Sequence, residues 1–326
     1  MPRKLLAQLA DASTKPTGEA LSALSGLDAR ALHDFQLIWA NTKVARRCEI
    51  LLALQPLLEA NATLDFSAVA TAALADPDGD VRAAAVPLLF DDVNPKPVIL
   101  LLDLLQSDPH APCRAAAARE LVEYAALGAT EDLPKNMMAR IEAGVLRAHR
   151  ADTDPNVKRT TLEALGYCLL PEVNEVLLAA SKTRDAQLLA SALLAMGHTC
   201  DSARWSKLVE RSLDHAVDYV RTAAVHACGE LQVQSAVPQI LELAMDGEPD
   251  TVSQAVWALG EIGNTDARAA LYQLQGLAEE DEELSAEIEE AIATLDLLSG
   301  EIDFDLMDGT DDDDPDVEDS PRRKAA

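Results

Sequence analysis

A segment of about 31 residues recurs six times along this chain, and no other feature restricts its fold as strongly. The copies begin near Asp76, Asp108, Asp154, Asp185, Asp218 and Asp250. Between the residues that open the helix in each copy, the steps are 32, 44, 31, 32 and 31 residues. Periods in this range are typical of helical solenoids. The long step holds roughly twelve extra residues near 128–135, where Gly, Thr, Asp and Pro predict a longer loop and an extended second helix.

Each repeat is predicted to contain two helices. The first follows an aspartate that is expected to cap it, carries small residues that permit close packing, and ends near a glycine that is expected to leave the helical conformation. Those glycines are Gly166, Gly197, Gly229 and Gly260. The second helix often opens with proline and shows an apolar stripe at helical spacing. One such stripe is Val237, Ile240, Leu241 and Ala244.

The composition agrees with an all-α fold. Apolar residues make up 48% of the chain but aromatic residues only 3%. Alanine and leucine suit closely packed helices, whereas a β-sheet depends on β-branched and aromatic side chains. We therefore predict an α-solenoid of helical hairpins and exclude an all-β architecture.

The repeats resemble a known family. They share an Asp-Pro opening, a Val-Arg pair at Val81-Arg82 and at Val220-Arg221, and an Ala-Leu-Gly-x-Ile-Gly close over 258–263. Together these features resemble HEAT repeats of the short bacterial, phycobilisome-lyase-like type. The resemblance implies a ladder of Asp–Arg pairs between repeats, here through Arg82, Arg114, Lys158 and Arg221, and broken at Leu189 and Val252. It also implies a kink in the first helix at Pro87.

Three regions are expected along the chain. Residues 1–75 predict a helical cap with a degenerate repeat, with helices near 18–25, 28–41, 43–60 and 65–75. Residues 76–298 form the HEAT-like array, which closes with an acidic helix. Residues 299–326 predict a disordered acidic tail, because few apolar residues oppose its charge. Both a solubilising role and docking through Ile302–Met307 fit this tail.

The charge limits the partners that the chain is expected to bind. With 27 basic and 56 acidic residues, the formal charge is -29, which disfavours nucleic acid and anionic membranes. Adaptation to a salty host is an alternative source of this acidity. We find no signal peptide or membrane-spanning run and expect a cytoplasmic protein. The five cysteines form no C-x-x-C pair and are expected to be reduced.

No motif of a known catalytic site is present, and we predict no cofactor and no metal. Two His-x-Cys pairs, His198/Cys200 and His226/Cys228, resemble zinc ligands. Alignment on the glycines places His198 after a helix end and His226 inside a helix, so we expect ordinary side chains. HEAT-like folds include deoxyhypusine hydroxylase, but its repeated His-Glu dipeptides are missing here.

The sequence favours a non-enzymatic scaffold or adaptor that binds a protein partner on the concave face of the solenoid. The alternative is a lyase-like or chaperone-like HEAT protein that acts on a bound prosthetic group such as a bilin. On the expectation that the second helices line the concave face, helix geometry predicts a contact ridge opposite their buried stripes. Its residues are Leu100, Asp103, Glu175, Leu178, Lys207, Glu210, Gln239, Glu242 and Tyr272.

Overall fold

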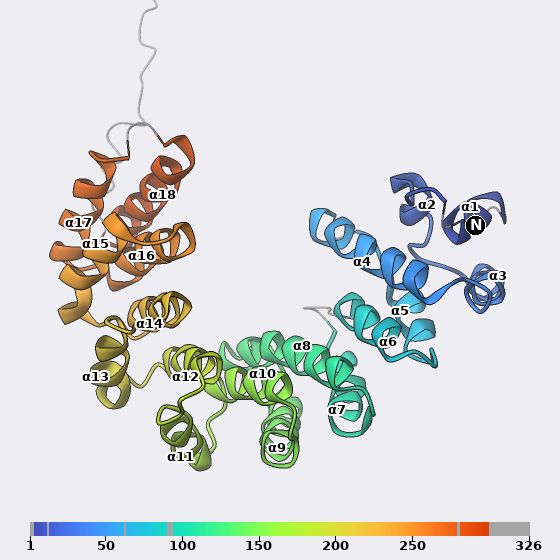
Figure 1. Ribbon diagram of the computed structural model, residues 1–326, viewed down its shortest axis with the longest axis horizontal. Helices are drawn as coiled ribbons and strands as arrows, with labels where there is room; N and C mark the ends of the chain where they lie inside the picture. The colour runs from blue at the N-terminus through green and yellow to red at the C-terminus, as the bar shows by residue number, and fades with distance from the viewer. Residues whose placement is uncertain (1–2, 12, 62, 90–93, 279–280, 300–326) are drawn as a thin grey trace, which may run out of the picture.

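The computed structural model describes residues 3–11, 13–61, 63–89, 94–278 and 281–299, and within these ranges every regular element is helical. The helices follow one another along a curved stack that forms an open arc (Figure 1). The all-α solenoid predicted from the repeat is thus confirmed. Except for Ser299, the tail expected at 299–326 lies outside the described residues.

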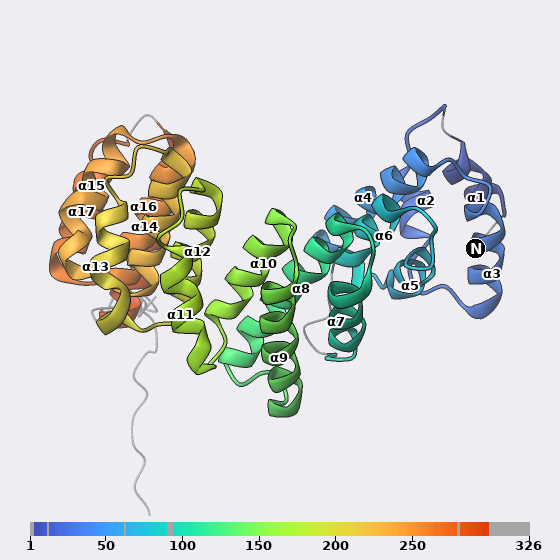
Figure 2. The same cartoon turned by 60° about the horizontal axis from the view of Figure 1, so that its bottom comes forward.

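The arc has two rows of helices. In Figure 1 the inner row follows the concave side, and Figure 2 brings the outer row to the front. The inner row contains α8 (Ala111–Ala129), α10 (Pro155–Gly166), α12 (Ala186–His198), α14 (Asp218–Glu230) and α16 (Pro249–Ile262). The outer row contains α7 (Pro97–Ser107), α9 (Lys135–Ala151), α11 (Pro171–Ala180), α13 (Ser202–Ser212), α15 (Val237–Asp246) and α17 (Thr265–Gln275).

This arrangement corrects the expectation that the second helix of each repeat lines the concave face. The second helices form the outer row, and the alanine-rich first helices form the inner row. The physical reason is helix spacing. Small side chains let helices approach closely, so the row that carries them becomes the shorter, inner side of the arc.

The repeated glycines also have a different role from the one expected. Gly166, Gly197 and Gly229 lie at or just before the last residue of their helices, and none has a positive φ. A Cβ on Gly166 would lie 2.5 Å from the carbonyl oxygen of Ala195, and one on Gly229 would lie 2.9 Å from Cα of Ala258. These glycines are needed for contact between successive inner helices. The left-handed residue at a helix end is Gly263, with φ of 66°, directly after α16.

The first 75 residues contain the four helices predicted there and one more. The additional helix is α1 (Arg3–Ala10), and the predicted ones are α2 (Gly18–Ser22), α3 (Ala29–Trp39), α4 (Val44–Ala60) and α5 (Ser67–Ala73). The array begins with α6 (Gly79–Ala85), which a 3₁₀ turn, η1 (Val86–Leu89), follows directly. Pro87 lies in this turn, so the helix ends where a kink was expected, because proline removes a backbone donor.

The Asp–Arg ladder is present in the N-terminal half of the arc. Arg82 binds Asp108 of the next repeat at 2.8 Å, and Arg114 binds Asp152 at 2.6 Å. Arg47 of α4 binds Asp76 at 2.6 Å, which extends the ladder into the degenerate region. Beyond α8 the pattern changes. Lys158 donates to the carbonyl of His149, and Arg221 pairs with Asp218 of its own helix.

Several local expectations need correction. Asp154 and Asp185 cap their helices through side-chain hydrogen bonds, but Asp218 lies inside α14 and Asp250 inside α16. The extra residues near 128–135 lengthen both α8 and α9, so the connection between them stays short. Leu241 is half-buried because it lies at the edge of its stripe, whereas Val237, Ile240 and Ala244 are buried.

The C-terminal end of the array is closed as predicted by an acidic helix. This helix, α18 (Glu282–Ser299), packs against α16 and α17. A short 3₁₀ turn, η2 (Gln234–Ala236), leads into α15. None of the described helices is long and apolar enough to cross a membrane.

Candidate partner-binding surface

The inner helices present one exposed face to the concave side. Their buried residues include a column at equivalent positions of four repeats, with exposed fractions between 0% and 2%: Leu162, Leu193, Val225 and Val256. The residue after each of these is only half-buried: Glu163, Leu194, His226 and Trp257. Because outer helices cover the other side of each inner helix, this second column faces the inside of the arc.

Four ring side chains form a continuous line across this face, which we call the histidine–aromatic ladder: Tyr167, His198, His226 and Trp257. Tyr167 stacks on His198 with ring centroids 4.3 Å apart, and His226 stacks on Trp257 at 4.4 Å. The two imidazoles meet edge to face at 6.1 Å. Each ring comes from a different repeat, so the ladder spans the ends or faces of α10, α12, α14 and α16.

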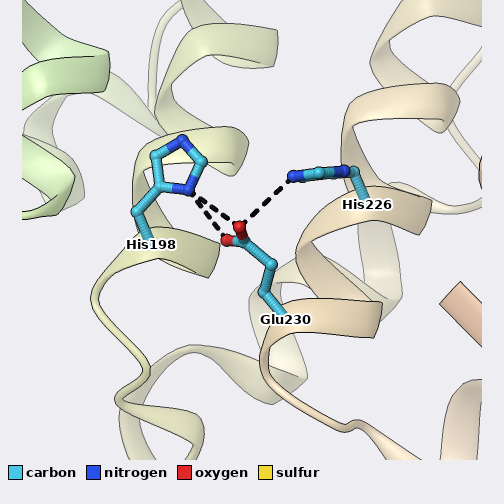
Figure 3. Close-up of side chains that lie close together, drawn as sticks. All are labelled: His198, His226 and Glu230. Carbon is cyan, nitrogen blue, oxygen red and sulfur yellow. Dashed lines mark hydrogen bonds and ion pairs between the residues drawn. The ribbon is translucent and has the colours of Figure 1, made fainter. Parts of the chain in front are cut away.

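Glu230 joins the two histidines of the ladder (Figure 3). Nδ1 of His198 lies 2.9 Å from one carboxylate oxygen, and Nε2 of His226 lies 3.3 Å from the other. Burial raises the pKa of the Glu230 carboxyl, but the hydrogen bonds with His198 and His226 outweigh it and hold the pKa at about 2. Burial lowers the pKa of His226, but the contact with Glu230 outweighs it, so that pKa lies above its ordinary value.

Polar contacts also connect the inner helices beside the ladder. Ser191 donates to Glu163 at 2.6 Å, and the hydroxyls of Thr222 and Thr251 lie 2.7 Å apart. Nδ1 of His226 lies 2.8 Å from the amide oxygen of Gln254. In this half of the arc, side-chain contacts on the concave face connect successive repeats where the Arg–Asp pairs have ended.

A cleft of about 1090 Å³ opens at the Tyr167 end of the ladder. It lies between the α8–α9 connection and the start of α11, and its walls include Met138, Tyr167, Leu170 and His198. Leu169 stands at this cleft with 92% of its surface exposed. An apolar residue this exposed beside a concave space indicates a place where another molecule can bind.

A second cleft of about 1110 Å³ lies near the N-terminal end of the array, between the α4–α5 connection, η1 and α8. Glu120 lines it although its side chain is buried, and burial, reinforced by Glu123, raises its pKa to about 7. Leu100, predicted as a contact residue, also borders this cleft.

The other predicted contact residues lie along the outer row. Leu178 and Tyr272 are exposed, at 44% and 51%, but they belong to α11 and α17. The remaining positions are on α7, α11, α13 and α15: Asp103, Glu175, Lys207, Glu210, Gln239 and Glu242. Their placement on the concave face was wrong, because it assumed the opposite order of the two rows. Glu163, expected on the outer side, belongs to inner helix α10.

The sequence contained a signal for the His198–Glu230 contact. These residues occupy equivalent positions, each directly after the repeated glycine, and equivalent residues of adjacent repeats are neighbours in a solenoid. His226 precedes Glu230 by four residues, which is one helical turn. Sequence reasoning compared each histidine with a nearby cysteine instead. Cys228 is buried and Cys200 is exposed, and neither belongs to the cluster.

Comparison with known proteins identifies the repeat. The family model for HEAT repeats matches residues 142–227 and 205–293. No curated protein matches the sequence. Similar solved structures include the CpcE–CpcF complex of phycocyanin lyase from Nostoc sp. PCC7120, with TM-score 0.47, 18% identity, and coverage of 69% of this chain and 93% of that chain.

Two further structures extend this comparison. A designed armadillo repeat protein in complex with the peptide (KR)4 has TM-score 0.40 and 17% identity, covering 61% of this chain and 99% of that chain. Human deoxyhypusine hydroxylase has TM-score 0.34 and 17% identity, covering 90% and 95%. From the matched repeats and the two-row helical architecture, the chain is a HEAT-repeat protein.

Proposed function

We propose that this protein is a non-enzymatic scaffold that binds a protein partner on the concave face of its arc. The observation that carries the proposal is the histidine–aromatic ladder, together with the half-exposed Leu194 beside it. Rigid aromatic rings flanked by charged groups are the composition of interface hot spots. Because the rings are held by stacking, little conformational entropy is lost when a partner binds them.

Charged residues border the ladder on both sides. Arg119 of α8 and Glu261 of α16 are exposed on the inner row, at its two ends. Such charges at the rim of an interface orient a partner and speed association, while the apolar centre supplies most of the affinity. The proposed surface therefore has an apolar and aromatic centre with a polar rim.

The test compares two double variants that leave the net charge of the chain unchanged. Arg119→Glu with Glu261→Lys alters the inner row, and Lys207→Glu with Glu242→Lys alters the outer row. Partners recovered by affinity purification with the wild-type protein are quantified by mass spectrometry for each variant. We expect the inner-row variant to lose a specific partner at least tenfold and the outer-row variant to retain it. Equal retention by both variants would contradict the proposal.

The cleft beside Tyr167 supports the alternative of a protein that handles a prosthetic group. Its volume of about 1090 Å³ and its apolar walls suit a planar ligand of that size. The purified protein would then carry a visible absorption band, and denaturation would release a small molecule. A protein that stays colourless when purified from its own host and releases nothing favours the scaffold.

A further inference from the structure

The side chains of His198, His226 and Glu230 converge from two repeats on one point. The three potential ligand atoms, an Nδ1, an Nε2 and a carboxylate oxygen, all lie within 4.8 Å of one another. The two imidazole-to-carboxylate distances are 2.9 and 3.3 Å. A metal ion bound at about 2.0–2.2 Å by imidazole and carboxylate ligands places its ligand atoms roughly 3 to 3.5 Å apart. Small side-chain rotations therefore suffice to enclose such an ion.

The hydrogen bond to Gln254 orients His226 as a ligand. The amide oxygen of Gln254 accepts only, so Nδ1 of His226 carries the hydrogen and donates it over 2.8 Å. In the neutral ring the lone pair on Nε2 then faces the Glu230 carboxylate (Figure 3). Two electron-rich groups in that position need a cation between them, either a proton or a metal. A ligating histidine that donates its other N–H to an oxygen is the usual arrangement at metal sites.

The ligands are held in place but are not sealed from solvent. Stacking on Tyr167 fixes the ring of His198, and stacking on Trp257 fixes the ring of His226. The exposed fractions of the His198, Glu230 and His226 side chains are 10%, 21% and 25%. An ion bound there would have three protein ligands and access to water or to a partner's side chain as a fourth.

We propose that His198, His226 and Glu230 bind one divalent transition-metal ion of the Zn²⁺ class and thereby link α12 to α14. Imidazole nitrogen and carboxylate oxygen are ligand types that Zn²⁺ accepts in tetrahedral geometry. The proposal reverses the expectation from sequence that the chain holds no metal. It does not depend on the partner-binding proposal, because the link lies within one chain and joins repeats that lack an Arg–Asp pair at this junction.

Metal binding is measured on the full-length, tag-free protein after treatment with a chelator. Titration with Zn²⁺ by calorimetry should give one tight site per chain, and Co²⁺ should produce visible absorption bands. We expect His226→Asn or Glu230→Gln to weaken binding at least 100-fold, and Gln254→Leu to weaken it about tenfold. His110→Asn is the matched control, because His110 also pairs with a carboxylate, Asp80, but outside the cluster. That variant should bind like the wild type.

A second measurement needs no substitution. Diethylpyrocarbonate modifies accessible imidazoles, and mass spectrometry locates the modified residues. Zn²⁺ should protect His198 and His226 but leave the exposed His33 reactive. The proposal is overturned if no saturable one-to-one binding occurs, if the ligand variants bind Zn²⁺ like the wild type, or if Zn²⁺ does not protect the two histidines. Each of these outcomes would assign the cation between His226 and Glu230 to a proton.

Discussion

At the scale of single residues, Glu120 is the least favourable group in the inner row. Its side chain is only 8% exposed, and burial, with Glu123 nearby, raises its pKa from 4.5 to about 7. The folded protein therefore binds a proton at this site more tightly than the unfolded chain does. Between pH 4.5 and 7 the free energy of unfolding falls as the pH rises, and above pH 7 the whole penalty remains.

We predict that Glu120→Gln stabilises the protein at pH 8 by roughly 1–3 kcal/mol, because it removes this buried charge. At pH 4.5 the gain should vanish, since the carboxyl is then protonated in the folded state. Chemical unfolding at both pH values measures the difference, with the exposed Glu175→Gln as control. A gain that is equal at both pH values would show that the effect is not electrostatic.

At the scale of elements, contact between successive inner helices depends on the repeated glycines. A Cβ on Gly229 would lie 2.8 Å from the Trp257 ring and 2.9 Å from Cα of Ala258. On Gly260, in the equivalent position one repeat later, the nearest atom would lie 3.5 Å away, on Ala291. The two positions share a place in the repeat but differ in the room available beside them.

We predict opposite effects for alanine at these two glycines. Gly229→Ala should destabilise the protein by about 1–2 kcal/mol, because overpacking against backbone exceeds the gain in helix propensity. Gly260→Ala should stabilise it by about 0.5–1 kcal/mol, because propensity acts there without a clash. Urea unfolding followed by circular dichroism compares the variants. A stabilising Gly229→Ala would mean that α14 and α16 are not in close contact at this position.

The elements also show how far the sequence alone could lead. Helix existence and period followed from the recurring Asp, Ala and Gly positions, and Arg82 and Arg114 pair as the resemblance implied. The order of the two rows did not follow, because an apolar stripe indicates which face of a helix is buried but not which row lies inside the curve. The cluster at Glu230 was missed for a related reason. Its members are 28 or more residues apart or one turn apart, and only stacking of repeats brings them together.

At the scale of the whole molecule, curvature turns equivalent positions of successive repeats into one surface. The Arg–Asp pairs connect the N-terminal repeats, and the histidine–aromatic ladder lies on the concave side of the C-terminal ones. A stack that contacts only nearest neighbours keeps its shape through many small interfaces and bends as a whole. Its inner face presents rigid positions along the length of the arc.

The measurement that most directly tests the concave face as the binding surface is site-specific photo-crosslinking in the host cell. A benzophenone amino acid is placed singly at Arg119 and Glu261 on the inner row, and at Lys207 and Glu242 on the outer row. Because all four side chains are exposed, each probe has equal access to a neighbour. We predict a discrete crosslinked partner from both inner positions and none from the outer ones. The same partner captured only from Lys207 and Glu242 would place binding on the convex face and contradict the proposed function.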